Sequence, residues 1–403
     1  MKKITFVYEN IVIGGVQTLL IRLSKALIKI GVNVEIYYSR IYERGELEFE
    51  EIGTNMYSYT RQYPYDIIES NKNSNIITFE VGTYMDMVVA NKKSSNTSIF
   101  LYSVHPYTFE YFYKSCKYSI FYKIFHNQYY KFVKRTVENG GVMFMDEQCF
   151  NHTCTEYDIN NIDDIDKYLL RVIMPVDDVE FNMDIHNNLF NILTVSRADF
   201  PFKGYIKGLI NCFKELQMSG KKLKLTIITS GTEKEQVYKW CENQENIEII
   251  EDVSYEKLKK YYREANVYVG MGTTILEAAA SGVVAIPIAP YTYECNTYGL
   301  FSEKPNWILT EIGEGKNIKN NLEYLMGLSD SDYEKLSILS KKSVQKLYGE
   351  EIVINKFKDI ISCSIKDKGA QYKYLPFGFI LFIKIKKVVK NLVERVRKVG
   401  KNA

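Results

Sequence analysis

Short apolar runs alternate along the chain with longer segments in which apolar residues recur every three or four positions. Runs of the first kind predict buried strands, and segments of the second kind predict amphipathic helices. A first series of strands is expected at residues 4–8, 32–38, 76–80, 98–103 and 142–145. A second series is expected at residues 191–196, 223–229, 247–250, 267–269 and 283–288, with helices at 207–218, 255–265 and 275–281. This alternation predicts an α/β protein with two parallel, Rossmann-like halves.

A polar stretch at Met174–Asn188, opened by Pro175, separates the two halves, and a helical pattern at Lys342–Ile361 follows the second. We therefore expect a first domain at residues 1–175 and a second domain at residues 190–345. A helix at residues 346–365 is expected to return to the first domain. Residues 371–403 are expected to form a C-terminal amphipathic helical tail.

The chain has 403 residues, of which 46% are hydrophobic and 25% charged. This composition excludes a disordered chain, a collagen-like repeat and a small disulfide scaffold. No apolar run approaches the roughly 20 residues of a membrane-spanning helix, and the N-terminus lacks the features of a signal peptide. The seven scattered cysteines suit a reducing compartment, so we expect a cytoplasmic protein. Cys149, His152 and Cys154 lack the spacing of a zinc site, so no metal is expected.

The net charge of +3 conceals an asymmetry between the tail and the rest of the chain. Residues 371–403 hold nine lysines and arginines and one acid, so this segment carries +8 and the remainder −5. Nucleic acid is not an expected partner, because its binding needs basic residues on the folded surface. The apolar residues of the tail share one helical face and the basic residues the other, which leaves two interpretations. The tail could dock on the body, but we favour a helix lying on an anionic membrane surface, with the protein peripheral on the inner face of the cell membrane.

Residues 107–137 are rich in aromatic side chains interspersed with lysines and arginines. A helix pair that covers the first sheet is the favoured explanation. A surface that contacts an acceptor or a membrane is the alternative, because aromatic rings stack on sugars and tolerate the bilayer interface.

Three glycine-containing motifs occur where a strand is expected to end and a helix to begin. Gly14 and Gly15 follow the first strand, and glycines there allow a ligand to approach the backbone. Arg197 ends the first strand of the second half, and Lys203 follows six residues later, so both cations can converge on a diphosphate. In the third motif, GMGTTILEAAASGV at residues 270–283, a glycine loop opens a helix whose first N–H groups can hold a phosphate.

These motifs, GGVQ, VSR with FKG, and GMGTTILEAAASGV, resemble those of the retaining nucleotide-sugar glycosyltransferases of family 4, the glycosyl transferases group 1. The resemblance covers about residues 1–362. It implies the GT-B fold, in which two Rossmann-like domains face a central cleft, with acceptor bound by the first and donor by the second. The implied activity is that of a glycosyltransferase of the hexosyltransferase type, which makes a cell-surface polysaccharide or glycolipid. A UDP- or GDP-sugar would be the donor, a saccharide or lipid-linked saccharide the acceptor, and no further cofactor is expected.

The resemblance also implies roles for individual residues. Arg197 and Lys203 would contact the donor diphosphate, Gly272, Thr273 and Thr274 would offer backbone amides to it, and Glu277 would bind the ribose. Gly14 and Gly15 would approach the phosphate or the acceptor from the first domain, and His105 would lie near the transferred sugar. Val253, within residues 251–254, would line the nucleotide base, although an ordinary strand–helix connection is as good an explanation there.

One position departs from the family pattern. The family has a first glutamate eight positions before the second, where this chain has Val269. We expect an active enzyme that recognises its donor differently. The alternatives are a non-catalytic GT-B partner of an active glycosyltransferase and, less favoured, a sugar-nucleotide epimerase, which would turn over without an acceptor.

Overall fold

The computed structural model describes every residue except 1, 13, 43–44, 60–62, 94–96, 115–119, 177–188, 252, 312, 364–367, 382–384 and 386–403. The chain divides into two compact units. Unit 1 comprises Met1–Arg171 with Ile354–Ala403, and unit 2 comprises Val172–Val353. Most of the basic tail lies outside the described residues.

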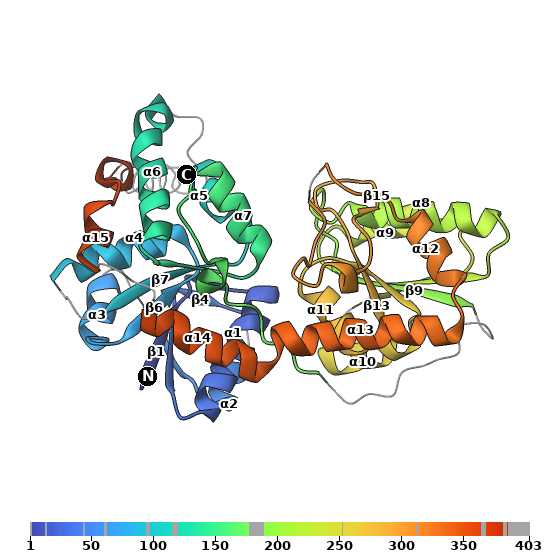
Figure 1. The fold of residues 1–403 in the computed structure, drawn as a ribbon, viewed down its shortest axis with the longest axis horizontal. Coiled ribbons are helices and arrows are strands. Elements are labelled where there is room, and N and C mark those ends of the chain that lie inside the picture. The colour runs from blue at the N-terminus through green and yellow to red at the C-terminus, as the bar shows by residue number, and fades with distance from the viewer. Residues whose placement is uncertain are drawn as a thin grey trace, which may run out of the picture. The chain divides into compact units, whose positions relative to one another are not determined.

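Unit 1 contains a parallel sheet of six strands in the order β5-β3-β1-β6-β7-β8. Figure 1 shows helices on both of its faces. This explains why a central strand such as β7 is apolar along nearly its whole length and buried throughout. The strands are β1 (Lys3–Val7), β3 (Asn33–Tyr38), β5 (Asn55–Ser58), β6 (Asn75–Thr78), β7 (Ser98–Ser103) and β8 (Val142–Phe144), and the short β2 (Asn10–Ile11) pairs with β4 (Arg40–Ile41). The helices are α1 (Gly15–Lys29), α2 (Gly45–Glu51), α3 (Tyr63–Ser70), α4 (Val81–Ala90), α5 (Thr108–Lys114), α6 (Ile120–Glu138), α7 (Glu147–Glu156) and α15 (Lys368–Lys373).

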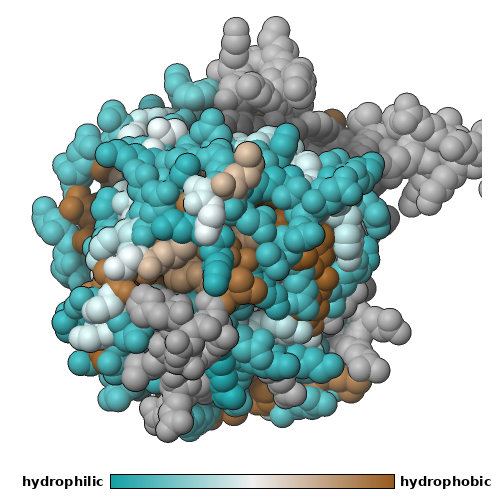
Figure 2. All heavy atoms as spheres, turned by 90° about the vertical axis from the view of Figure 1, so that its right-hand side faces the viewer, coloured by the Kyte–Doolittle hydropathy of each residue, from teal (hydrophilic) through white to brown (hydrophobic). Residues whose placement is uncertain are grey.

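Unit 2 contains a parallel sheet of five strands in the order β11-β10-β9-β12-β13. Helices again lie on both faces (Figure 1). The strands are β9 (Phe190–Arg197), β10 (Leu223–Ser230), β11 (Ile247–Glu251), β12 (Val267–Gly270) and β13 (Val284–Pro287), with a small antiparallel pair of β14 (Asn296–Thr297) and β15 (Lys316–Asn317). The helices are α8 (Tyr205–Met218), α9 (Lys234–Cys241), α10 (Tyr255–Glu264), α11 (Thr273–Ala280), α12 (Lys319–Met326) and α13 (Asp330–Tyr348). Figure 2 looks onto one side of the molecule, where the surface is mainly hydrophilic with scattered apolar patches.

Both predicted series of strands are present, and the α/β prediction is confirmed. Two local predictions need correction. The sequence analysis omitted β5, an edge strand whose residues are mostly exposed and therefore lack an apolar pattern. The helical pattern at Lys342–Ile361 is not one helix: α13 ends before Gly349, which has an extended backbone, and α14 (Glu350–Cys363) follows.

Residues 375–380, at the start of the predicted tail, belong to the core of unit 1. Leu375, Phe379 and Ile380 are buried there, and the Phe379 ring lies 5.4 Å from that of Tyr129 on α6. Within the described part of the chain, no helix combines the length and apolar character needed to cross a membrane.

Candidate functional site

The sheet of unit 2 reverses its strand order between β9 and β12. From β9 the chain proceeds to β10 and β11 on one side, and then crosses back to β12 and β13 on the other. The connections that leave the carboxyl ends of β9 and β12 therefore diverge, and ligands of open α/β sheets bind in the crevice that this creates. Arg197 is the last residue of β9, and Gly270 is the last of β12.

Arg197 and Lys203 present two positive charges to this edge. Arg197 is exposed, whereas Lys203 is half-buried, with its ammonium 4.7 Å from the centre of the Phe202 ring. The pKa of Lys203 is lowered to about 7, chiefly by burial and then by the nearby Arg197 charge, while Asp199 acts against both. The pair is therefore electrostatically unfavourable by itself, and an anion that bridged the two cations would relieve this.

The turn that carries Lys203 is held in place by close backbone contacts. The Lys203 N–H donates to the Asp199 carbonyl at 2.7 Å, and the Tyr291 N–H donates to the Phe202 carbonyl at 3.1 Å. A Cβ atom at Gly204 would lie 2.7 Å from the carbonyl oxygen of Thr292, so only glycine fits there. These contacts fix the backbone of the FKG segment, and with it the Cα atom of Lys203.

The second connection begins a helix directly behind a strand. Gly272 is the N-cap of α11 with φ 74°, a conformation that favours glycine, and its N–H donates to the Ile308 carbonyl at 2.8 Å. Thr273 starts the helix, and the Thr274 hydroxyl donates to the Met271 carbonyl at 3.1 Å. The Ile275 N–H donates to the Gly272 carbonyl at 3.1 Å, so the amides of Thr273 and Thr274 are the ones that the helix start leaves without an intrahelical acceptor, at the positive end of the helix dipole.

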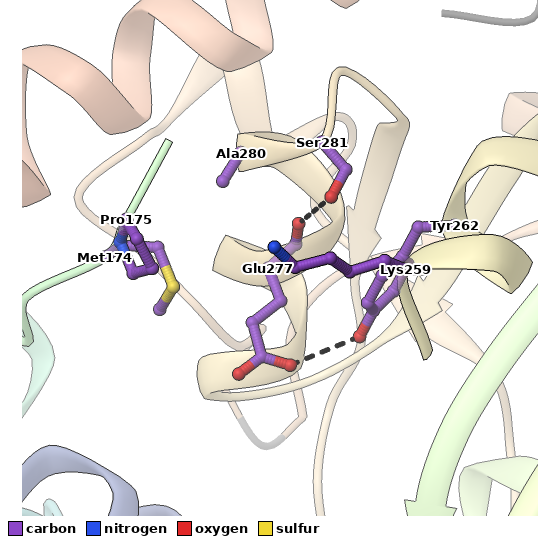
Figure 3. Close-up of a pocket in the computed structure, with 7 residues that line it drawn as sticks. All are labelled: Met174, Pro175, Lys259, Tyr262, Glu277, Ala280 and Ser281. Carbon is purple, nitrogen blue, oxygen red and sulfur yellow. Dashed lines mark hydrogen bonds between the residues drawn. The ribbon is translucent and has the colours of Figure 1, made fainter. Parts of the chain in front are cut away.

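Glu277 lies one turn further along α11 and is buried. Its carboxylate accepts a hydrogen bond from the Tyr262 hydroxyl of α10 at 3.3 Å, as Figure 3 shows. Both residues line a small pocket of unit 2, together with Met174, Pro175, Lys259, Ala280 and Ser281. Lys259 and Tyr262 were not predicted as site residues. Their three-residue spacing, which puts them on one face of α10, was the only available signal.

In unit 1, Gly14 and Gly15 lie at the start of α1, with open space beside the Gly14 backbone. His105 follows β7 and is half-buried, with the rings of Tyr107 and Tyr111 at 5.5 and 5.2 Å. The Tyr107 N–H donates to Nδ1 of His105 at 3.1 Å, so the proton of the neutral ring lies on Nε2.

Residues 181–295 match the family model described as Glycosyl transferases group 1. The chain carries a group 1 glycosyltransferase domain. No curated protein sequence matches it.

Solved structures extend the likeness over both units of the chain. A glycosyltransferase from Rickettsia africae has a TM-score of 0.63 at 14% identity, covering 90% of this chain and 100% of that one. TarM of S. aureus, in a complex that contains UDP, has 0.62 at 11%, covering 89% and 99%. HepE of Anabaena, in complex with UDP-glucose, has 0.57 at 11%, covering 90% and 100%. These likenesses show the fold, which is GT-B.

The position at which the family has its first glutamate lies inside a strand of this protein. Val269 lies within β12, is fully buried and belongs to the core of unit 2. Only Met271 and Gly272 separate β12 from α11, so position 269 falls in the strand instead of the connection. A carboxylate at this position would be buried among apolar side chains.

Val253 is half-buried in the connection between β11 and α10, and Asp252 lies outside the described residues. Its neighbour Glu251 pairs with Lys234 and accepts a hydrogen bond from Tyr238 at 2.8 Å. Because β11 is the edge strand, β10 separates it from β9. Among the described residues, no three His, Cys, Asp or Glu side chains are placed to share a metal ion.

Proposed function

We propose that this group 1 glycosyltransferase transfers a hexosyl group from a UDP- or GDP-sugar to a saccharide or lipid-linked saccharide. The observation that supports it best is the meeting of Arg197, Lys203 and the start of α11 at one reversal of strand order. Two cations and a helix N-terminus at such a crevice suit a diphosphate.

In the proposed reaction the bond between the sugar C1 and the diphosphate oxygen breaks, and negative charge develops on the departing diphosphate. Arg197, Lys203 and the amides of Thr273 and Thr274 stabilise that charge. The Gly272 N–H was expected to join them, but it donates to the Ile308 carbonyl, so Gly272 contributes the turn that opens the helix. Glu277 accepts hydrogen bonds from ribose hydroxyls in the pocket that it shares with Tyr262. Val253 lines the nucleotide base.

The acceptor part of the proposal concerns unit 1. An acceptor hydroxyl forms the new bond to C1 from the face that the diphosphate leaves, with retention, and its proton passes to the leaving group. Gly14 and Gly15 lie beside the donor phosphate or the acceptor, and His105 lies near the transferred sugar. In this proposal, residues 1–175 form the acceptor domain and residues 190–345 form the donor domain. A helix at residues 346–365 returns to the first domain.

We further propose that the tail at residues 371–403 binds an anionic membrane on the inner face of the cell membrane, where the product enters a cell-surface polysaccharide or glycolipid. The buried Phe379 fixes the start of the tail to unit 1, while Phe377 and Leu381 are 45% and 61% exposed. This arrangement favours a tail that leaves the acceptor-binding unit. Binding to vesicles with and without anionic lipid, by the full chain and by a chain ending at residue 385, tests it.

The donor part is tested by screening UDP, GDP and their sugars for thermal stabilisation, since a ligand of the folded state raises its stability in proportion to RT ln(1 + [L]/Kd). Arg197→Ala should then reduce turnover by about 100-fold or more, as expected when an interaction with developing charge is lost. Lys239→Ala, which removes an exposed charge from α9 of the same unit, is the control. Full activity of Arg197→Ala would refute the role of this residue.

A non-catalytic GT-B partner is a second candidate, and the buried Val269 is the observation in its favour. Such a protein would show neither nucleotide-sugar binding nor slow donor hydrolysis when isolated. Either activity in the purified full chain decides for the enzyme.

A further inference from the structure

The connection that follows β13 packs directly against the FKG turn and the start of α8. It comprises residues 288–295, between β13 and β14. A Cβ atom at Gly208 of α8 would lie 2.5 Å from the backbone nitrogen of Cys295. Gly204, which meets the Thr292 carbonyl, lies four residues earlier and therefore on the same face of the helix. The backbone of this connection thus lies against α8 with no side chain between them.

Tyr291, within this connection, has an unusual backbone conformation. Its φ is 58°, in the left-handed region. In the part of the chain that the structure describes, the other non-glycine residues with positive φ are all asparagine or aspartate, which tolerate this region; they are Asn73, Asp158, Asn243 and Asn246. A tyrosine gains nothing locally from such a conformation, so contacts with other segments must hold it there.

Phe202 provides two of these contacts. The Tyr291 N–H donates to the Phe202 carbonyl at 3.1 Å, and the centres of the two rings lie 4.9 Å apart. The ammonium of Lys203 lies 4.7 Å from the centre of the same Phe202 ring. The Phe202 ring therefore joins Tyr291 to Lys203, and the support that Tyr291 gives to this ring also fixes the surroundings of the ammonium.

We propose that Tyr291 is a positioning residue of the donor site, which holds the Lys203 ammonium in place through the Phe202 ring. This inference rests on the proposed function, in which Lys203 contacts the donor diphosphate, and it adds the residue that keeps the ammonium there. A glycine would adopt the Tyr291 backbone without strain, so the tyrosine ring is the feature that needs a role. Without that ring, the Phe202 side chain can turn away and the Lys203 ammonium becomes better hydrated.

The first test measures Lys203 in the ligand-free full chain. Competitive acetylation with acetic anhydride as a function of pH, read by peptide mass spectrometry, gives the pKa of its ammonium. This pKa should lie near 7 in the wild type, because the group is buried. Tyr291→Gly keeps the turn but loses the ring, so burial of the ammonium should diminish and the pKa of Lys203 should rise toward 10.5. Tyr291→Phe keeps the ring and should restore the wild-type value.

The second test measures nucleotide affinity. Isothermal titration calorimetry with UDP and with GDP at about pH 6 keeps Lys203 mainly protonated in every variant. Tyr291→Gly should bind the nucleotide about fivefold more weakly than the wild type, within the range that an aromatic pair contributes. Tyr291→Phe should bind it as the wild type does. A role confined to stability would change the unfolding temperature and leave both the pKa of Lys203 and the affinity unchanged.

Tyr293→Ala is the matched control, because it removes a 46% exposed ring of the same connection that lies 5.8 Å from the ammonium of Lys207. It should leave the pKa of Lys203 and nucleotide binding unchanged, and thermal unfolding verifies that each variant is folded. The proposal is overturned if Tyr291→Gly has the wild-type pKa of Lys203 or the wild-type affinity, or if Tyr293→Ala shifts both equally. Failure of both nucleotides to bind the wild type would contradict the proposed donor site, whereas acetylation, which needs no ligand, would still decide whether Tyr291 positions Lys203.

Discussion

The depressed pKa of Lys203 predicts that binding of the donor consumes a proton. In the free protein the ammonium has a pKa of about 7, because it is half-buried and lies near Arg197. A diphosphate placed between the two cations adds negative charge and returns the pKa toward its ordinary value of 10.5. At pH 7, where about half of the free protein carries this proton, each bound nucleotide sugar should take up about half a proton.

The sign and size of the pH dependence follow from this linkage. The affinity for the nucleotide sugar is highest at pH values below the pKa of Lys203 in the free protein. It falls as the pH rises through that value, because protonating Lys203 then costs part of the binding free energy. Between pH 7 and pH 9 the protonated fraction of free Lys203 falls from about one half to about one hundredth, so affinity should fall by up to about 50-fold, or about 2.3 kcal/mol. Lys203 is only half-buried, so this value is an upper bound.

Isothermal titration calorimetry with the nucleotide sugar selected by the thermal screen measures the effect. The binding enthalpy at pH 7 should differ between phosphate and Tris buffers, which have different ionisation enthalpies. Lys203→Arg keeps its charge at all these pH values, so its proton uptake and pH dependence should disappear. Lys207→Arg, on the exposed side of α8, should behave as the wild type. A wild-type enthalpy independent of buffer, with an affinity unchanged from pH 7 to pH 9, would show that Lys203 does not meet the diphosphate.

Two further predictions concern stability. Phe379→Ala removes a fully buried ring that packs on Phe112, Phe125 and Tyr129 and should lower the free energy of unfolding by about 3–5 kcal/mol in urea denaturation. Phe377→Ala, at a 45% exposed position, should change it by less than about 0.5 kcal/mol, and equal losses would show that this segment does not dock as described. Val269→Glu places an unpaired carboxylate in the core of unit 2 and should reduce the unfolding temperature sharply without increasing donor hydrolysis. A stable variant with faster hydrolysis would mean that position 269 reaches the donor after all.

The sequence predicted the strands well where burial is complete. β7 was predicted with its observed bounds, since every residue from Ser98 to Ser103 is buried between two helical layers. β5 was not predicted, because an exposed edge strand has no apolar periodicity. The division between α13 and α14 was not predicted, because the apolar spacing continues across Gly349. A single glycine in a helical pattern can either lie within a helix or end it, and the sequence does not distinguish the two.

The candidate site was predictable where several of its residues are consecutive. The segment from Gly272 to Glu277 combines a helix start, its amides and a carboxylate within two helical turns, so local rules suffice. Phe202 and Tyr291 are far apart in the chain and meet only because the connection after β13 packs against the FKG turn. Such packing is a tertiary property, and the short sequence around Tyr291 carries no sign of it. Lys259 was missed for a similar reason, since its pocket exists only where α10 packs against α11.

The two reversals of strand order differ in charge, and this difference supports the assignment of substrates to units. In unit 2, Arg197, Lys203 and the positive end of α11 lie at the crevice, so an anion is bound there with favourable electrostatic energy. A neutral sugar would not relieve the repulsion between the two cations. In unit 1, where the strand order reverses between β1 and β6, the corresponding edge receives Glu9, Glu80 and His105. A diphosphate there would meet two acids, whereas hydroxyl groups can pair with an acid and a histidine N–H alike. The electrostatics of each sheet edge thus favour donor binding by unit 2 and acceptor binding by unit 1, independently of the family resemblance.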